Sequence, residues 1–272
     1  MAVMAGCSQS TNLPAPQTDT SPLRQFFGID TFEKQQHLDL LREQRISNCM
    51  RVHGFRYVPS ALGKFTAYGS GGYLENLRSH GYGLSDALDA PPPVDPNSQV
   101  FKNFSPVEKS AYVSALDGAN PANPKSADSS CRGLASGGRT GRLLMTDMQQ
   151  KLRDMQKRTD ADPRVRTINV RWSRCMLKSG YKVASRQQIV PNILAPLRNR
   201  LATDSGSGRP KPEVINRLRI TELKIANTDA ACSQANDLDE IHKVSAEFET
   251  ELIQNNRDAF NHQKEINRGL PG

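Results

Sequence analysis

Residues 49–55 read Cys-Met-Arg-Val-His-Gly-Phe, and residues 175–181 read Cys-Met-Leu-Lys-Ser-Gly-Tyr. Both stretches fit the pattern Cys-Met-x-x-x-Gly-aromatic, and their cysteines lie 126 positions apart (175 minus 49). A pattern of this length that occurs twice in a chain of 272 residues predicts two similar structural units, one in each half.

Each motif lies at the end of a stretch with helical periodicity. Gly54 and Gly180 stand where the helix is expected to end, because glycine readily adopts the left-handed conformation that closes a helix. Phe55 and Tyr181 follow at the position that packs back on the last helical turn. Each unit is therefore predicted to be an amphipathic helix with a buried cysteine, a glycine cap and an aromatic clamp. The apolar positions are Leu38, Leu41, Ile46, Cys49 and Met50 in the first helix, and Val165, Ile168, Trp172, Cys175 and Met176 in the second.

The other two cysteines of the body, Cys131 and Cys232, lie downstream, one in each half. The simplest pairing is Cys49–Cys131 and Cys175–Cys232, because it keeps each bond within its unit. Four cysteines allow three pairings, and spacing alone does not choose among them. Buried free thiols in a cytosolic protein are the alternative. No C-x-x-C pair or zinc-finger spacing occurs, so we expect no metal and no cofactor.

The remaining elements are predicted to be helices joined by loops, and strand signals are weak throughout. The fold class is mostly α, an irregular helical bundle with a loop region rich in Gly, Tyr and Pro at 55–104. Ser105-Pro106-Val107-Glu108 carries the residues of a helix start, with Ser as N-cap, Pro at the first position and Glu at the third. The expected helices are 31–53, 73–79, 106–117, 131–158, 163–175, 186–201, 213–235 and 241–266, with an exposed linker at 204–212.

The net charge of +8 is unevenly distributed along the chain. Residues 1–136 are neutral, residues 137–219 carry 19 basic and 6 acidic residues, and residues 220–272 carry 5 basic and 10 acidic residues. This pattern indicates either compensation between helices or contact with an anionic phospholipid surface or wall polymer. Nucleic acid is the least favoured partner, because the basic band has one Trp and one Tyr and lacks interleaved aromatics for base stacking.

The N-terminus resembles a lipobox, in which small residues precede a cysteine that is acylated after signal cleavage. Met4-Ala5-Gly6-Cys7 supplies the box, and residues 8–22, rich in Ser, Thr, Gln and Pro, have the composition of a flexible tether. Only six residues precede Cys7, with no Lys or Arg, so we interpret the stretch as a lipobox remnant, with a chance match as the alternative. We predict three segments: 1–22 as remnant and tether, 23–136 as the first helical unit and 137–272 as the second, packed together as one domain.

Motifs of enzymes are missing. The chain has no G-x-x-x-x-G-K-[ST], H-E-x-x-H or G-x-S-x-G, and no apolar run of the roughly 18–20 residues that span a bilayer. We therefore predict no catalytic residues. Cys49 and His53, one helical turn apart, form a weak candidate for a thiolate nucleophile. Tyr68, Tyr73 and Tyr82 mark region 64–84 as a possible ligand or glycan surface, so a secreted enzyme or glycan-binding protein is the alternative function. A basic nucleic-acid-binding protein acting through 137–219 is the third.

The combined motifs resemble a family of actinobacterial secreted proteins and lipoproteins of uncharacterised function. The likeness rests on three stretches. The first is CMRVHGFRYVP at 49–59, and the second is GYGLS through LDG at 81–118, followed by Cys-Arg-Gly at 131–133. The third is RWSRCMLKSGY at 171–181, followed by ELKIANTDAAC at 222–232.

This resemblance covers about 31–265, and in it Asp229 and Cys232 match an Asp-x-x-Cys that ends the unit. It implies export, lipidation at Cys7 and disulfides, and it implies no established activity. Members resemble accessory proteins of the cell envelope more than enzymes. We therefore expect an extracytoplasmic lipoprotein on the outer face of the cell membrane, or a secreted form, acting as a non-catalytic binding or accessory module.

Overall fold

The computed structural model describes residues 21–60, 73–91, 95–203, 210–235 and 238–269. Within these residues the chain forms helices and no strands, which confirms the mostly α class. The α-helices are α1 (Pro22–Phe27), α2 (Phe32–Val52), α3 (Tyr73–His80), α4 (Leu84–Asp89), α5 (Asn97–Lys102), α6 (Pro106–Asp117), α7 (Pro124–Asp128), α8 (Cys131–Ala135), α9 (Gly138–Ala161), α10 (Pro163–Lys178), α11 (Ala195–Thr203), α12 (Pro212–Gln234), α13 (Leu238–Asn255) and α14 (Arg257–Arg268).

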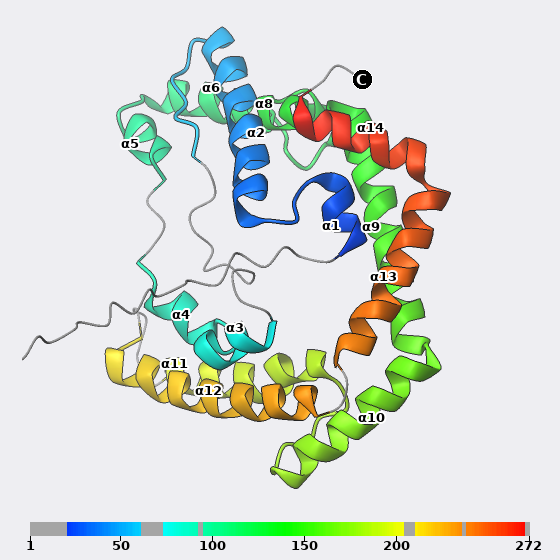
Figure 1. The fold of residues 1–272 in the computed structure, drawn as a ribbon. Coiled ribbons are helices and arrows are strands. Elements are labelled where there is room, and N and C mark those ends of the chain that lie inside the picture. Colours follow the sequence, from blue (N-terminus) through cyan, green and yellow to red (C-terminus); the bar gives the residue numbers. More distant parts are fainter. Residues whose placement is uncertain (1–20, 61–72, 92–94, 204–209, 236–237, 270–272) are drawn as a thin grey trace, which may run out of the picture.

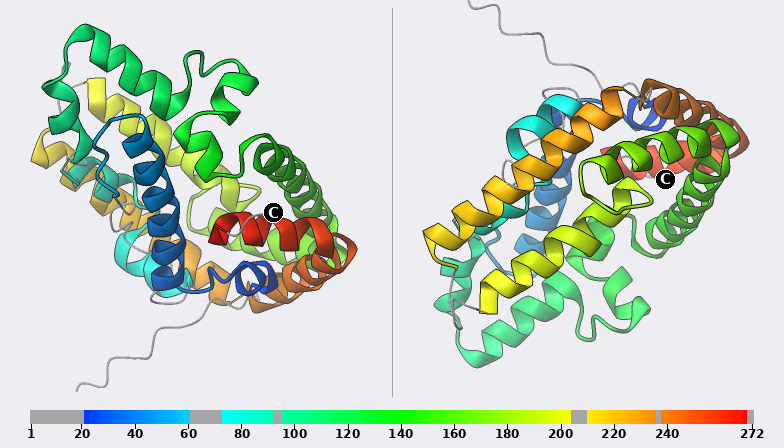
Figure 2. Two further views of the ribbon diagram at one scale, coloured as in Figure 1. Left: turned by 90° about the horizontal axis from the view of Figure 1, so that it is seen from above. Right: turned by 90° about the horizontal axis from the view of Figure 1, so that it is seen from below.

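The helices form three groups of packed neighbours (Figure 1, Figure 2). Helices α2, α6 and α8 pack together, α3 and α4 lie on α12, and α13 runs beside α9 and α10. Helix α14 contacts both α9 and α2. Because α3 and α4 precede position 136 and pack on α12, the two predicted units interlock instead of meeting at one boundary.

Both predicted disulfides are present, and each lies inside an apolar cluster of its own unit. Cys49 and Cys131 have Cα atoms 5.5 Å apart, and Cys175 and Cys232 have Cα atoms 5.7 Å apart. The first cluster contains Ile46, Met50, Tyr57, Tyr112, Leu116, Cys131 and Ala135. The second contains Trp172, Met176, Val183, Ile189, Leu194, Ile225 and Cys232.

The glycine caps and aromatic clamps are confirmed as predicted. Gly54 has φ 80° and Gly180 has φ 89°, both in the left-handed region. The Phe55 amide donates to the Met50 carbonyl at 2.9 Å, and the Tyr181 amide donates to the Met176 carbonyl at 2.9 Å. These bonds reverse the chain at the end of α2 and α10 in the same way and satisfy carbonyls that the helix itself leaves unpaired.

A serine two positions before each cysteine extends the repeat beyond the predicted motif. Ser47 Oγ donates to the Tyr57 carbonyl at 2.8 Å, and Ser173 Oγ donates to the Val183 carbonyl at 2.5 Å. Both bonds span ten residues, so each serine fixes the segment that leaves the glycine cap. The pattern Ser-x-Cys-Met was visible in the sequence and belongs to the motif.

Three predicted helices are divided in the structure. The stretch at 186–201, expected to be short or interrupted by Pro191 and Pro196, is a 3₁₀-helix at Arg186–Gln188, a π-helix at Val190–Leu194 and then α11. The stretch predicted as one helix from 131 to 158 is α8 followed by α9, because Gly137 has φ 88° and Gly138 has φ 58°, which interrupts the helix. A Cβ at Gly137 would lie 2.8 Å from Ile266 Cγ2, so glycine there also allows α14 to approach. The final helix is divided into α13 and α14 at Asn256, whose φ is −131°.

The start of the body precedes the predicted boundary at 22/23. Ser21 caps α1, and its Oγ donates to Glu249 Oε2 at 2.6 Å. Helix α1, together with the short helices α4, α5 and α7, was not predicted, because pieces of five or six residues carry too little periodicity to be recognised. Among the described helices, none combines the length and the apolar character that crossing a membrane requires.

We predict that loss of a disulfide is costly. Replacing both Cys175 and Cys232 by Ala should lower the free energy of unfolding by roughly 4 kcal/mol, because the bond closes a loop of 57 residues in the unfolded chain. Urea denaturation of the double variant measures the change, with Cys7→Ser as the matched control. An unchanged denaturation midpoint would contradict the prediction.

Candidate functional site

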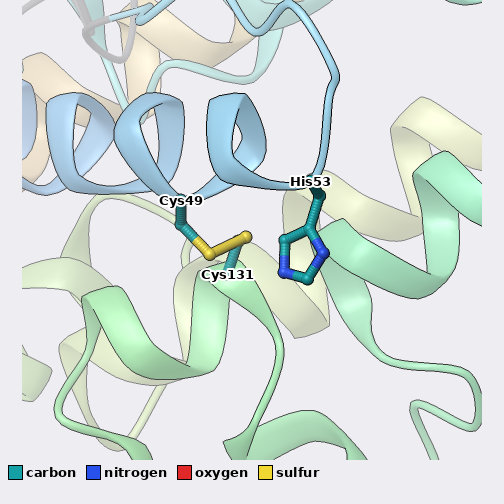
Figure 3. Close-up of side chains that lie close together, drawn as sticks. All are labelled: Cys49, His53 and Cys131. Atoms are coloured by element: carbon teal, nitrogen blue, oxygen red, sulfur yellow. A yellow bond between two sulfur atoms is a disulfide. The ribbon is translucent and has the colours of Figure 1, made fainter.

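The structure places Cys49, His53 and Cys131 together at the end of α2, but it forms no reactive thiol there (Figure 3). Their sulfur and nitrogen atoms lie within 4.8 Å of one another. Both sulfurs belong to the disulfide, so neither is a thiolate nucleophile or a metal ligand in this state. His53 caps α2 and is exposed. Neither thiolate catalysis nor metal binding is supported at this position.

Of the three tyrosines predicted to line a ligand surface, the structure describes the side chain of Tyr82 alone. Tyr68 and the side chain of Tyr73 lie outside the described residues. The Tyr82 side chain points into the molecule, where its hydroxyl donates to Asp229 Oδ2 at 2.9 Å. The Tyr82 hydroxyl is therefore engaged by a buried carboxylate, and its ring packs against the cluster around Trp172.

Asp229 is fully buried and is the acceptor for groups from three segments. Its Oδ1 accepts from Trp172 Nε1 at 2.8 Å and from Ser233 Oγ at 3.0 Å. The Arg186 guanidinium stacks on the Trp172 ring at 4.8 Å and lies 3.8 Å from the same Oδ1. Because Cys232 follows three positions later on α12, the Asp-x-x-Cys pattern joins a hydrogen-bond acceptor and a disulfide at one helical turn.

Glu222 is the second fully buried carboxylate of α12, and it caps another helix. Its two oxygens accept from the amides of Tyr82, Leu84 and Ser85 at 2.8–2.9 Å, where α4 begins. The negative charge is stabilised by the N-terminal dipole of that helix. A Cβ at Gly81 would lie 2.6 Å from Glu222 Cγ, so glycine is required for this approach. Sequence gives no sign of this contact because the partners are backbone amides.

We predict that Glu222→Gln lowers the free energy of unfolding by about 2 kcal/mol, since the amide group places a donor against backbone donors. The control is Glu213→Gln, an exposed position on the same helix, where a change below about 0.5 kcal/mol is expected. Thermal and urea denaturation measure both. Equal effects of the two substitutions would contradict a capping role for Glu222.

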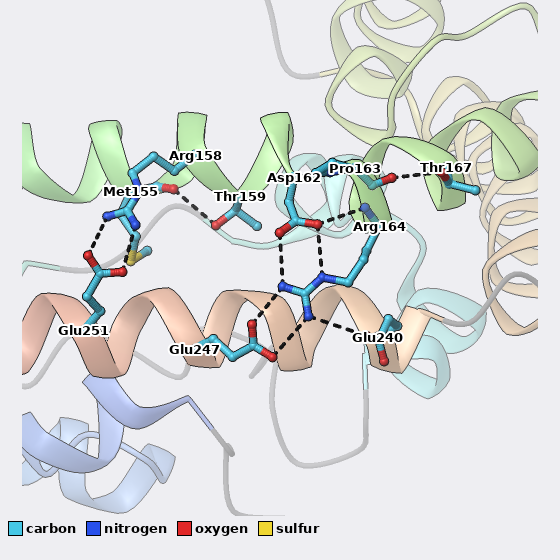
Figure 4. A network of polar contacts seen from close by, with 10 residues as sticks. All are labelled: Met155, Arg158, Thr159, Asp162, Pro163, Arg164, Thr167, Glu240, Glu247 and Glu251. Atoms are coloured by element: carbon cyan, nitrogen blue, oxygen red, sulfur yellow. Dashed lines mark hydrogen bonds and ion pairs between the residues drawn. The ribbon is translucent and has the colours of Figure 1, made fainter.

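The acidic C-terminal helices compensate part of the basic band (Figure 4). Arg158 on α9 forms two hydrogen bonds with Glu251 on α13, at 2.7 and 3.1 Å. Arg164, at the start of α10, bonds Asp162 and Glu247. These bonds hold the pKa of the Asp162, Glu247 and Glu251 carboxyls below their usual range. Compensation between helices, one of the two interpretations of the charge pattern, accounts for these residues.

A cavity of about 940 Å³ lies between α2, α9 and α14. Short helices α7 and α8 close one side. Four arginines and three aspartates line it: Arg42, Arg45, Arg132, Arg142, Asp39, Asp117 and Asp128. Arg132 pairs with Asp117, and Arg142 pairs with Asp128. Arg42 lies 3.7 Å from a carboxylate oxygen of its neighbour Glu43.

Arg45 has a structural role in this cavity. Its guanidinium donates to the carbonyls of Ala135 and Asn267 at 3.0–3.4 Å, at the C-terminal ends of α8 and α14. A cation is favourable at the negative end of a helix dipole. Burial lowers the pKa of Arg45, although an arginine remains charged at neutral pH.

Two polar atoms of the cavity lining are buried without a hydrogen-bond partner. They are Arg42 Nε, a donor, and Gln263 Oε1, an acceptor, and the Gln263 residue is 3% exposed. Buried polar groups normally have partners. Both atoms are covered by the surrounding wall, so they do not face the hollow.

The chain matches no protein-family model, no curated protein and no solved structure. The residues themselves therefore carry the functional argument.

Proposed function

We propose that the protein is a non-catalytic binding or accessory module of the cell envelope, anchored outside the membrane by acylated Cys7. The observation that carries this proposal is the pair of buried disulfides, because such bonds persist in oxidising compartments and are rare in the cytosol. Cys131 and Cys232 are 0% and 2% exposed, so the bonds belong to the packed interior and not to a surface redox site.

Cys7 lies outside the described residues. The proposed lipid anchor therefore rests on the sequence. Cys7 follows small residues, as in a lipobox, and it is the fifth cysteine, left over once the other four are paired. The chain from Cys7 to Ser21 can span up to roughly 45 Å when extended. That reach allows the folded body to lie on a membrane or to stand away from it.

Acylation of Cys7 predicts partition with the membrane. Expressed from its own gene, the protein should enter the detergent phase on Triton X-114 separation, and Cys7→Ser should move it to the aqueous phase. Ser8→Ala, which keeps the thiol, is the matched control. If the Cys7→Ser protein still enters the detergent phase, Cys7 is not the lipid anchor. If the exported protein has four alkylatable thiols without reduction, it does not fold in an oxidising compartment.

We further propose that the cavity between α2, α9 and α14 is the binding site of this module. The lining carries four arginines against three aspartates, together with the amide side chains of Gln35 and Gln149, so the fitting ligand carries an anionic group together with hydroxyls. Acidic sugars have this chemistry. The cavity volume of about 940 Å³ lies within the range of small-molecule sites.

This site predicts that glucuronate at millimolar concentration raises the melting temperature more than glucose does, because glucose lacks the carboxylate. Arg42→Gln should remove the difference, whereas Arg51→Gln, at an exposed position of the same helix, should keep it. Differential scanning fluorimetry measures the shifts. If neither sugar alters the melting temperature, or if Arg42→Gln responds like the unchanged protein, the cavity is not such a site.

A further inference from the structure

The stretch from 163 to 203 contains nine Lys and Arg residues and no Asp or Glu. Two of these arginines are engaged by other side chains: Arg164 pairs with Glu247 of α13, and Arg186 stacks on Trp172. Four others lie on α10 itself and are exposed: Arg166, Arg171, Arg174 and Lys178. No hydrogen bond or ion pair joins these four side chains to another residue in the described part of the chain.

These four cations share one side of α10. At 3.6 residues per turn, positions 166, 170, 174, 177 and 178 fall within an arc of about 120°, and Arg171 lies at its edge. The opposite side carries Val165, Ile168, Trp172 and Met176, which are buried. Two aliphatic side chains lie among the cations on the exposed side, Val170 at 50% and Leu177 at 58% exposure. We call these six residues the basic face of α10.

We propose that the basic face of α10 docks on the anionic phospholipid surface of the membrane. Lys and Arg side chains reach phosphate headgroups while their stems and neighbouring aliphatic groups enter the interfacial layer. A soluble polyanion would use the four cations, but it offers nothing to Val170 and Leu177. The mixture of exposed cations and exposed aliphatic side chains therefore fits a lipid surface better than a polymer.

The position of α10 agrees with this role. Helix α10 runs along the lower edge of the molecule in Figure 1, and its contacts are to α9, α12 and α13. Ser21, where the N-terminal segment joins the body, bonds Glu249 of α13, and Glu247 of the same helix pairs with Arg164 at the start of α10. One helix thus connects the attachment point of the N-terminal segment and the basic face. This inference deepens the proposed envelope function but does not depend on acylation.

The test uses the full chain carrying Cys7→Ser, so that no acyl chain contributes. Sedimentation with phosphatidylcholine vesicles containing about 30% phosphatidylglycerol should show binding that weakens at higher ionic strength. Arg166→Gln, Arg174→Gln and Lys178→Gln together should lower the partition coefficient roughly 100-fold, since each cation contributes about fivefold near an anionic surface. The matched control removes the same charge at exposed Arg56, Lys102 and Lys125 and should retain binding.

A second variant separates lipid from polymer. Val170→Ser with Leu177→Ser should weaken vesicle binding while leaving retention on immobilised dextran sulfate unchanged. Equal vesicle binding by the two triple variants, or no vesicle binding at all, would overturn the inference. If the two serine substitutions leave vesicle binding unchanged, the basic face of α10 binds a polyanion and not a lipid surface. None of these outcomes bears on acylation, which the detergent partition of the natural Cys7 protein tests separately.

Discussion

A covalent bond between the end of one helix and a distant second helix is the constraint on which the packing of each unit depends. Hydrophobic residues make up 36% of the chain and mean hydropathy is −0.60, so apolar burial alone supplies a modest driving force. Each disulfide removes freedom from the unfolded chain over 82 or 57 residues. The methionine beside each bond, Met50 or Met176, is fully buried. The glycine turn and the serine bond then direct the following segment back over that cluster.

Sequence predicted what depends on neighbouring residues. The caps at Ser105, Gly54 and Gly180 require particular residue types within a few positions, and all three occur as expected. The paired cysteines followed from the repeat. The serines at 47 and 173 obey the same local rule and could have been included.

Contacts that use the backbone of a distant segment could not be predicted. Glu222 binds amides near position 84, and Arg45 binds carbonyls at positions 135 and 267. Any residue presents an amide and a carbonyl, so these partners leave no signature in composition or spacing. The hydrogen bond from Tyr82 to the buried carboxylate Asp229 could likewise not be predicted, because burial of the acceptor is not visible along the chain.

The contact between Ser21 and Glu249 has a mechanical consequence. It joins residues 228 positions apart, and the Leu23 amide donates to the same Glu249 carboxylate at 3.1 Å. Tension applied through the N-terminal segment therefore passes into α13 at mid-length, and α13 is itself bonded to α9 through Arg158. Glu247 of the same helix pairs with Arg164 at the start of α10, so a pull from the N-terminal end would also load the helix that carries Cys175.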